Sequence, residues 1–337
     1  MVRDLGIPGL VEALEGGERR AVARLLTVIE DGSPEQLGEV VRRLYTRTGN
    51  ARVFGITGAP GVGKSTLTSV LAAKLRERGR AVGVVAVDPS SPFSGGALLG
   101  DRVRMQSHHD DPGVFIRSMS ARGRLGGIAF ATPQAVLVLD AAGYDDIVIE
   151  TVGVGQSEVE VASTADTTVV CVAPGMGDSV QTAKAGILEV ADVFVINKAD
   201  QGGAGRTESD LRSMIELGHE LGEIEWWPPI VRTVAVRGEG IDELVTALDE
   251  HSAHLMSSGG LAVRQRERAR HAVHEIALAK VRQRFGRLVT TEDNGGPLSE
   301  TLAEKVANRD LDPYTAADQL LDALSTDAGH LGSRRRP

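Results

Sequence analysis

The segment Gly58–Ser65 reads G-A-P-G-V-G-K-S and fits the phosphate-loop pattern G-x-x-x-x-G-K-[ST]. It directly follows the apolar run Phe54–Thr57 and opens a stretch with helical periodicity. This strand–loop–helix context separates a phosphate loop from a chance glycine-rich turn. Glycines let successive backbone N–H groups converge on phosphate oxygens, and the N-terminus of a helix adds positive potential. The pattern therefore predicts a buried strand, a nucleotide-binding turn and a helix, in that order.

The loop and the first helical residues are expected to contact the nucleotide. Lys64 is expected to bridge the β- and γ-phosphates and to act in catalysis, because this position needs a compact ammonium group. The Ser65 hydroxyl is expected to ligate Mg²⁺. The predicted phosphate-binding residues are Gly58, Ala59, Pro60, Gly61, Val62, Gly63, Lys64, Ser65 and Thr66.

From about Arg52, runs rich in Val and Ile alternate with segments of helical period, which predicts a doubly wound α/β domain with a mostly parallel sheet. Several runs are apolar on both faces, as buried parallel strands should be. The predicted strands are Arg52–Thr57, Ala81–Val87, Val114–Arg117, Asp146–Glu150, Thr167–Ala173, Val193–Asn197 and Ile230–Val236. The predicted helices between them are Lys64–Arg78, Pro133–Ala142, Asp178–Val190, Glu208–Leu221 and Asp242–His254.

The 337 residues suit one large domain with helical extensions at both ends. Residues 1–48 are predicted to be a helical N-terminal extension, with a helix starting at Ser33 (the N-cap) followed by Pro at the first helical position. The phosphate-loop domain is expected over residues 49–256, and a helical arm over residues 257–330. Leu261–Phe285 is predicted to be a basic helix. A basic helix can bind RNA or anionic lipid, but the favoured interpretation is a solvated arm or an interface helix.

Composition excludes several classes of function. Lys plus Arg number 37 and Asp plus Glu 46, and this net charge of −9 argues against a protein that coats nucleic acid. Cys171 is the one cysteine, which excludes an intramolecular disulfide or a cysteine-cluster metal site. No apolar run approaches the roughly 18 residues that span a membrane, and the first residues lack the apolar region of a signal peptide. We expect a cytoplasmic protein that binds neither membrane nor nucleic acid.

A second motif, Asn197-Lys198-Ala199-Asp200, ends the apolar run Val193–Ile196 downstream of the phosphate loop. A carboxylate suits guanine, whose N1–H and N2–H₂ are adjacent donors, whereas adenine has an acceptor at N1. Asp200 is therefore predicted to select guanine, because an unpaired buried polar group discriminates strongly. Asn197 is expected to hold the loop and the purine edge, and the stem of Lys198 to lie over the base.

A backbone contact to guanine O6 is expected from the end of the next strand. The residues predicted for it are Thr233, Val234 and Ala235.

Acidic residues end two apolar runs at the edge where the phosphate loop is expected. Asp88 follows Ala81–Val87 and Glu150 follows Ile147–Ile149, and the carboxyl ends of parallel strands share one edge of a sheet. We predict that Asp88, Asp101 and Glu150 lie with Ser65 on the metal side of the site, because Mg²⁺ prefers oxygen ligands. A helix cap is the alternative role for each of these three acids.

The stretch after Glu150 resembles the switch pattern D-x-x-G with Glu in place of Asp. The N–H of Gly153 is then expected to meet the γ-phosphate, and Glu150 to hold Mg²⁺ through water. Gln156 comes three residues after Gly153, so the sequence does not identify the residue that orients the attacking water. Low intrinsic turnover is expected, because in-line attack needs a placed water and a cation on the developing charge.

Taken with the phosphate loop, five further strings are similar to one family. They are V-D-P-S-S-P-F at 87–93, G-D-R-V-R-M at 100–105, E-T-V-G-V-G-Q-S-E at 150–158, K-A-G-I-L at 184–188 and V-I-N-K-A-D at 195–200. The chain resembles the MeaB/ArgK family of P-loop GTPases, to which the human methylmalonic aciduria type A protein is related. The resemblance covers about residues 20–255 well. It departs at 175–180, where the family more often has G-A/T-G-D-x-L.

The resemblance implies a GTP-binding and GTP-hydrolysing chaperone, with GTP or GDP and Mg²⁺ as cofactors. The partner it implies is an adenosylcobalamin-dependent acyl-CoA mutase, chiefly methylmalonyl-CoA mutase, which the chaperone assists in cofactor loading and protection. A cobalamin adenosyltransferase is a further candidate partner. The resemblance also implies a homodimer formed through C-terminal helices. It assigns Asp88, Asp101 and Glu150 to the metal side, and places Lys184 in a third switch loop that becomes catalytic with the partner bound.

Two other functions are weighed against this one. The first is a nucleotide-dependent kinase or ATPase that serves lysine, arginine or ornithine transport, an older label for the family; Asn197–Asp200 argues against ATP. The second is a nickel-delivery GTPase, which would need Cys and His ligands that one cysteine cannot supply.

Overall fold

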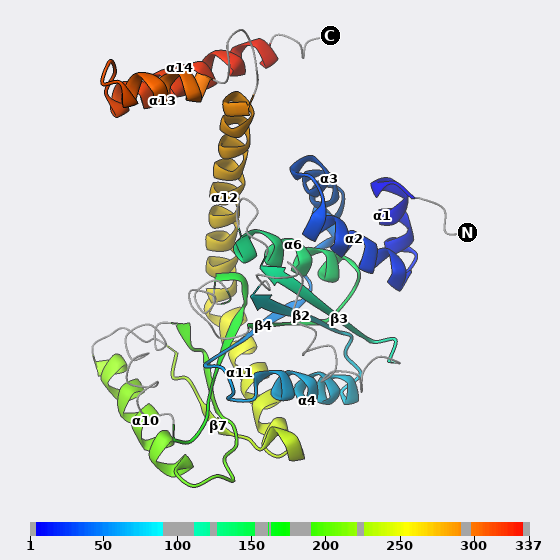
Figure 1. The fold of residues 1–337 in the computed structure, drawn as a ribbon. Coiled ribbons are helices and arrows are strands. Elements are labelled where there is room, and N and C mark those ends of the chain that lie inside the picture. Colours follow the sequence, from blue (N-terminus) through cyan, green and yellow to red (C-terminus); the bar gives the residue numbers. More distant parts are fainter. Residues whose placement is uncertain are drawn as a thin grey trace. The chain divides into compact units, whose positions relative to one another are not determined.

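A computed structural model describes the structure of residues 5–89, 111–121, 127–151, 161, 163–175, 190–220, 226–290 and 298–332 (Figure 1). The chain divides into two compact units, Met1–Arg268 and Ala269–Pro337. The first unit contains the sheet, and the second contains the greater part of one long helix and two further helices.

The first unit is built on a seven-stranded sheet in which every pairing of neighbours is parallel. The strands are β1 (Arg52–Thr57), β2 (Val82–Pro89), β3 (Val114–Ala121), β4 (Asp146–Thr151), β5 (Thr167–Val172), β6 (Val193–Ile196) and β7 (Ile230–Arg232). Their order is β3-β2-β4-β1-β5-β6-β7, which confirms the predicted doubly wound α/β fold. After β1 the chain crosses to β2 on one side of the sheet, and after β5 it crosses to β6 on the other side. Sheets of this kind bind ligands at such a reversal of direction, beyond the carboxyl ends of the two strands.

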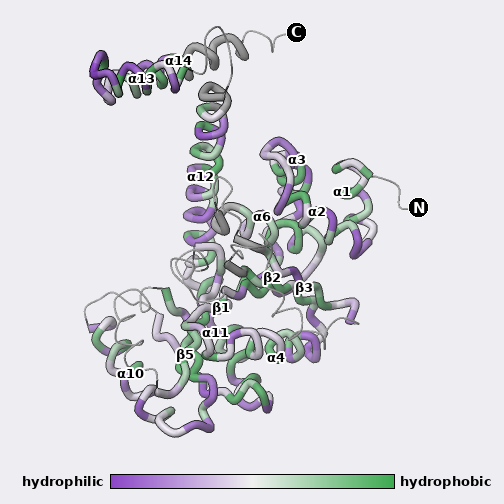
Figure 2. The backbone as a smooth tube through the Cα atoms, viewed as in Figure 1, coloured by the Kyte–Doolittle hydropathy of each residue, from purple (hydrophilic) through white to green (hydrophobic). Residues whose placement is uncertain are grey.

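Helices cover both faces of the sheet because alternate residues of each strand point to opposite faces. On one face, Phe54 and Ile56 of β1 pack in a core with α4 (Lys64–Glu77) and α11 (Ile241–Ser258). On the other face, Val53 packs with α6 (Gly127–Ala141) and with three N-terminal helices. Figure 2 shows β2 and β5 as mostly hydrophobic, which suits strands that are covered on both sides.

The N-terminal helices are α1 (Ile7–Glu15), α2 (Arg19–Asp31) and α3 (Pro34–Leu44). The predicted start at Ser33 is confirmed. Its hydroxyl accepts from Gln36 N at 3.3 Å, while Ser33 N donates to the Gln36 amide at 2.8 Å. Leu25, Leu26 and Leu44 are fully buried, so these helices share the core of the first unit.

Helix α10 (Ala204–Glu220) packs on β5 and β6, and the short 3₁₀ turn η3 (Ala235–Arg237) follows β7. The C-terminal helices are α12 (Gly260–Thr290), α13 (Leu298–Ala307) and α14 (Pro313–Gly332). Asp312 caps α14: its carboxylate accepts from the hydroxyl and N–H of Thr315 and from Tyr314 N, and these bonds lower the pKa of Asp312. Among the helices that the structure describes, none combines the length and apolarity needed to cross a bilayer.

Three predicted strand ends are wrong by more than one residue. The strand predicted to end at Val87 continues to Pro89, where it still pairs with β3. The strand predicted over Ile230–Val236 stops at Arg232, because the chain turns there to bond Asn197. The strand predicted to end at Arg117 continues to Ala121, because it pairs with β2 along its whole length.

Two predicted helix starts are also wrong. The helix expected to begin at Glu208 begins at Ala204. The helix expected to begin at Pro133 begins at Gly127, so that Pro133 lies inside α6. Proline has a helix-compatible φ, but it lacks the N–H and its ring crowds the carbonyl of the fourth residue before it, so a helix accommodates it only at a cost. The helix predicted over Asp178–Val190 falls outside the described residues, except for Val190.

The first turns of α12 are fastened to the sheet by two arginines. The Arg264 guanidinium donates to both carboxylate oxygens of Asp192 at 2.7 and 2.8 Å and to the carbonyl of Asp166 at 2.6 Å. Arg268 donates to the Thr164 carbonyl at 2.7 Å and to the Asp166 carboxylate. The two carboxylates also accept from the backbone of the sheet, from Thr168 N and Val53 N respectively. This arrangement was not predicted from the sequence.

Asp192 is buried, and its ionisation is tied to Arg264. Burial acts to raise the pKa of Asp192, but hydrogen bonds from Arg264 and His251 outweigh it and hold that pKa below its ordinary value of 3.8. A lowered carboxyl pKa stabilises the fold above that ordinary value, and the contribution is lost as the pH falls through the lowered pKa.

Arg264→Ala is therefore expected to lower the free energy of unfolding of the first unit by about 2 kcal/mol at pH 7, because it strands a buried carboxylate while Arg264 is itself one-third exposed. The difference from wild type should shrink below about pH 4. Urea unfolding followed by tryptophan fluorescence reports on the surroundings of Asp192, because Trp226 Nε1 donates to the Asp192 carbonyl at 2.8 Å. Arg212→Ala, at an exposed arginine that pairs with Glu208 one helical turn away, is the control and should cost less than about 0.5 kcal/mol. If Arg264→Ala lowered the free energy of unfolding equally at pH 7 and below about pH 4, the pairing of Arg264 with an ionised Asp192 would be contradicted.

Candidate nucleotide-binding site

The phosphate loop joins β1 to α4 through three glycines in the left-handed region, with φ values of +137° at Gly58, +81° at Gly61 and +97° at Gly63. Two of them also lie close to neighbouring segments, Gly58 to strand β5 and Gly63 to the residue that follows β6. A Cβ at Gly58 would lie 2.1 Å from the Cys171 carbonyl oxygen, and one at Gly63 would lie 2.4 Å from the Asn197 amide nitrogen. Only glycine satisfies both the backbone and the space, so the loop shape follows directly from the sequence.

Lys64 is the first residue of α4 and its side chain folds back over the loop. Its Nζ donates to the carbonyl of Gly58 at 2.7 Å and to that of Ala59 at 3.0 Å, and the residue is only 5% exposed. A compact positive charge is thus held against the backbone of the phosphate loop. This is the arrangement that a diphosphate or triphosphate requires.

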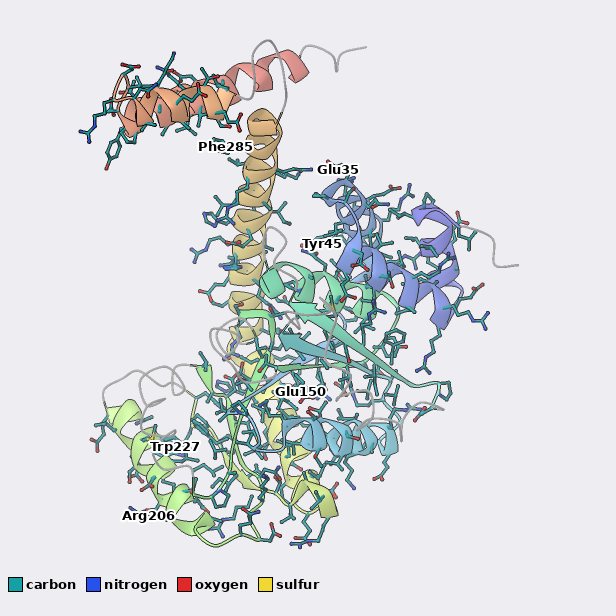
Figure 3. All side chains as sticks on the ribbon, viewed as in Figure 1. Glu35, Tyr45, Glu150, Arg206, Trp227 and Phe285 are labelled. Atoms are coloured by element: carbon teal, nitrogen blue, oxygen red, sulfur yellow. The ribbon has the colours of Figure 1, made fainter. Side chains whose placement is uncertain are left out.

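Ser65 and Glu150 come together at the carboxyl ends of β1 and β4. The Ser65 hydroxyl donates to Glu150 Oε1 at 2.5 Å, and Glu150 is buried (Figure 3). A hydroxyl and a carboxylate are hard oxygen ligands of the type that Mg²⁺ takes together with phosphate oxygens and water. The donor set therefore fits the predicted magnesium site. Among the described residues, no group of three or more His, Cys, Asp and Glu side chains is placed to hold a metal ion.

Four other predicted residues are not described in full. Asp101, Gly153 and Lys184 lie outside the described residues, and of Asp88 only the backbone is described, at the end of β2. Their proposed roles at the metal and in the switch segments stay predictions.

Asn197 ties the phosphate loop to the predicted base-binding segments. Its Nδ2 donates to the Val62 carbonyl at 2.8 Å, and its Oδ1 accepts from the Thr233 hydroxyl and from Ala235 N, both at 3.1 Å. Asn197 is 3% exposed and sits directly after β6. One side chain therefore fixes the loop after β1 against the segment after β7.

The predicted backbone donors after β7 already have partners. Ala235 N bonds the Asn197 side chain, and Val234 N donates to the Glu239 carbonyl at 3.1 Å. A contact from either N–H to guanine O6 would have to share or exchange one of these bonds.

Lys198 and Asp200 complete the base motif. Lys198 has a left-handed φ of +57°, which is uncommon for a residue other than glycine, and its Nζ donates to the Gly61 carbonyl at 2.7 Å. Its stem therefore runs from the base motif to the phosphate loop. The carboxylate of Asp200 is 39% exposed and lies 3.4 Å from Arg237 Nη1. Arg237 was not among the residues predicted for the site.

Cys171 lies in β5 beneath the phosphate loop. Burial raises the pKa of its thiol to about 12, so it is neutral at physiological pH. The residue packs as a small apolar side chain, in agreement with its predicted place in a strand.

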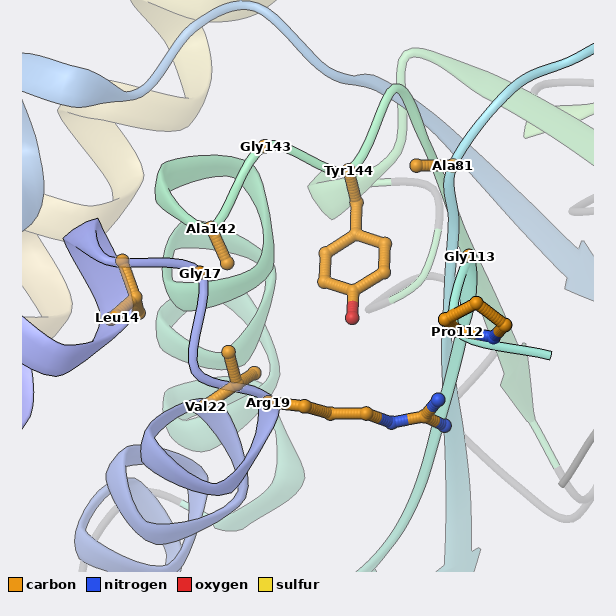
Figure 4. Close-up of a pocket in the computed structure, with 10 residues that line it drawn as sticks. All are labelled: Leu14, Gly17, Arg19, Val22, Ala81, Pro112, Gly113, Ala142, Gly143 and Tyr144. Atoms are coloured by element: carbon orange, nitrogen blue, oxygen red, sulfur yellow. The ribbon is translucent and has the colours of Figure 1, made fainter. Parts of the chain in front are cut away.

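A separate cavity of about 180 Å³ opens near the amino ends of β2, β3 and β4 (Figure 4). The Tyr144 hydroxyl and the Arg19 guanidinium line it. None of the residues predicted for nucleotide binding lies in it, and it is on the opposite edge of the sheet from the phosphate loop.

Comparison with known proteins gives a consistent assignment. A family model described as "Methylmalonyl Co-A mutase-associated GTPase MeaB" matches residues 22–289. A Pyrococcus abyssi protein named as a GTPase is 48% identical over 319 residues, covering 94% of this chain and 97% of that protein. The mouse methylmalonic aciduria type A homolog is 34% identical, over 94% of this chain and 79% of the mouse protein.

Among solved structures, that of a protein named LAO/AO transport system kinase is similar, with a TM-score of 0.64. It is 27% identical, and the match covers 96% of this chain and 99% of the other.

Proposed function

The chain belongs to the MeaB family of mutase-associated P-loop GTPases, and from this premise we propose that it binds GTP and GDP between the phosphate loop and Asn197–Asp200 and hydrolyses GTP with Mg²⁺. The single observation that carries this proposal is the bonding of Asn197 to both Val62 and the segment after β7. That bonding supports a single nucleotide site formed by the phosphate loop and the base motif together.

The residues divide the chemistry between them. Lys64 supplies positive charge to the β- and γ-phosphates, and the loop N–H groups cradle their oxygens. Ser65 and Glu150 would hold Mg²⁺, which neutralises charge on the phosphates when it is bound. Asp200 accepts from the two donors of the guanine edge, and Lys198 flanks the base.

We further propose that intrinsic turnover is low. In-line attack needs a placed water and a cation on the developing charge. Lys184 and the stretch that holds Gly153 and Gln156 are the candidates for these roles, and a partner protein would place them. Asp88 and Asp101 are proposed on the metal side of the same site.

The proposed partner is an adenosylcobalamin-dependent acyl-CoA mutase, with methylmalonyl-CoA mutase as the first candidate. The description of the matching family model, which names a mutase-associated GTPase, supports this choice. The chain would couple GTP binding and hydrolysis to loading and protection of the mutase cofactor, with a cobalamin adenosyltransferase as a further candidate partner. We propose that it acts as a homodimer through the helical arm at 257–330.

A second candidate function is a kinase or ATPase component that serves amino-acid transport. One observation favours it, namely the similarity to the solved structure of a protein named LAO/AO transport system kinase. The exposed carboxylate of Asp200 argues for guanine over adenine and so against this candidate.

The test of the partner uses the full chain immobilised with GDP or with a non-hydrolysable GTP analogue, and purified methylmalonyl-CoA mutase in solution. We expect mutase retention that depends on which nucleotide is bound. Asp200→Asn under the same guanine nucleotides is the control and should abolish that dependence. A chain that hydrolyses GTP but retains no mutase in either state would reject this partner and leave the GTPase assignment standing.

A further inference from the structure

Arg237 faces the carboxylate that is proposed to read the base. It is the last residue of η3, and its Nη1 lies 3.4 Å from Asp200 Oδ2. Both side chains are partly exposed, 50% for Arg237 and 39% for Asp200. Within the described part of the chain, Arg237 is the charged group that pairs with Asp200.

The turn that carries Arg237 is held tightly in place. Val234 N donates to the Glu239 carbonyl at 3.1 Å, and Arg237 N donates to the Val234 carbonyl at 2.8 Å. Gly240 has a φ of +78°, and a Cβ there would lie 2.0 Å from the Arg232 carbonyl oxygen. The backbone of this turn therefore has little freedom to carry Arg237 away from Asp200.

Glu239 orients the guanidinium from the other side. Its Oε1 accepts from Arg237 Nε at 2.8 Å, while Nη1 of the same guanidinium faces Asp200. The group of Asp200, Arg237 and Glu239 carries a net charge of −1. Arg237 thus divides its donors between two carboxylates, and only its Nη1 faces Asp200.

We propose that Arg237 is a positioning residue that holds the Asp200 carboxylate in the orientation that reads both donors of guanine. This inference rests on the proposed guanine-nucleotide function and adds to it a residue that sets specificity for the exocyclic amino group.

The physical reason is the geometry of the guanine edge. N1–H and N2–H₂ point side by side, so both carboxylate oxygens must lie near the plane of the base. Each oxygen has two acceptor positions, so Arg237 can occupy one on Oδ2 and leave the others for the base. A bound base also displaces water from the pair, which strengthens the attraction between the two charges.

Hypoxanthine provides the test, because it keeps N1–H and lacks the amino group. Calorimetric titration of the full chain with GDP and with inosine diphosphate separates the two contacts. Arg237→Ala is expected to weaken GDP binding by about three- to tenfold and inosine diphosphate binding by less than about twofold. The preference for GDP over inosine diphosphate therefore falls.

Two further variants sharpen the result. Arg237→Lys should restore part of the preference, because it keeps the positive charge. In an Asp200→Asn background, Arg237→Ala should change neither affinity by more than about twofold, because its target carboxylate is gone. The matched control is Arg232→Ala, at a half-exposed arginine in β7 that pairs with Glu208, and it should leave both affinities unchanged.

Equal weakening of both nucleotides by Arg237→Ala would show a merely structural role and overturn the inference. Tighter GDP binding would also overturn it, since Arg237 would then compete with the base. Wild-type protein that binds ADP as tightly as GDP would instead reject the proposed function itself. Selective GDP binding with an unchanged preference in Arg237→Ala rejects only the role of Arg237.

Discussion

The Lys64→Ala variant is expected to hydrolyse saturating GTP at least about a hundredfold more slowly than wild type. Lys64 is only 5% exposed and its Nζ donates to two loop carbonyls, so its charge already lies at the phosphate loop before the reaction begins. Charge that needs no reorganisation is what stabilises the transferring phosphoryl group most. Phosphate release under single-turnover conditions measures this loss directly.

The matched control is Lys74→Ala, which removes the same residue type from the other end of α4. Lys74 pairs with Asp242 at 2.9 Å and with Glu77 at 3.1 Å, away from the loop. It should leave hydrolysis within about twofold of wild type. Lys64→Arg should be nearly as inactive as Lys64→Ala, because a planar guanidinium does not replace a compact ammonium there. If folded Lys64→Ala, checked by circular dichroism, kept a tenth of the wild-type rate, the phosphate-loop assignment would be wrong.

The second large effect is expected at Asp200. Wild-type protein should bind GDP at least about a hundredfold more tightly than ADP, because adenine presents an acceptor where Asp200 needs a donor. Asp200→Asn should lower GDP affinity by a similar factor, since an amide donor then faces the donors of guanine. The same variant should gain affinity for xanthosine diphosphate, whose C2 carbonyl accepts from that amide.

Competitive titration with GDP, xanthosine diphosphate and ADP measures all three preferences in one experiment. Asp242→Asn is the control, because this exposed acid on α11 pairs with Lys74 and has no contact with the base motif. Comparable binding of GDP and ADP by wild type, or an unchanged preference in Asp200→Asn, would reject the assignment of Asp200 as the guanine reader.

The parallel sheet and the phosphate loop could be predicted because their signals are local. The strands β4 and β5 are marked by short apolar runs, Ile147–Ile149 and Val169–Val172, and the loop glycines are required by positive φ values within six residues. Strand and helix ends were predicted less well. The end of β7 depends on the bond between Ala235 and Asn197, which lie 38 residues apart.

The contacts that the sequence did not predict join residues far apart in the chain. Arg264 reaches Asp192 across 72 residues, and Arg268 reaches Thr164 across 104. Arg237 and Asp200 are separated by 37. The charge pattern predicted that Arg264 and Arg268 lie in a basic helix. It does not identify the acid that each arginine meets once the strands are assembled.

The fastening of α12 decides where this protein can be shortened. A chain cut at Gly259 would lack Arg264 and Arg268, and would remove the guanidinium groups that bond the buried carboxylates of Asp192 and Asp166. Asp166 also accepts from Val53 N in β1, the strand that leads into the phosphate loop. Truncation at Gly259, although distant in sequence from the phosphate loop, is therefore expected to destabilise β1, the strand that leads into that loop. A stable minimal fragment has to extend at least to residue 268.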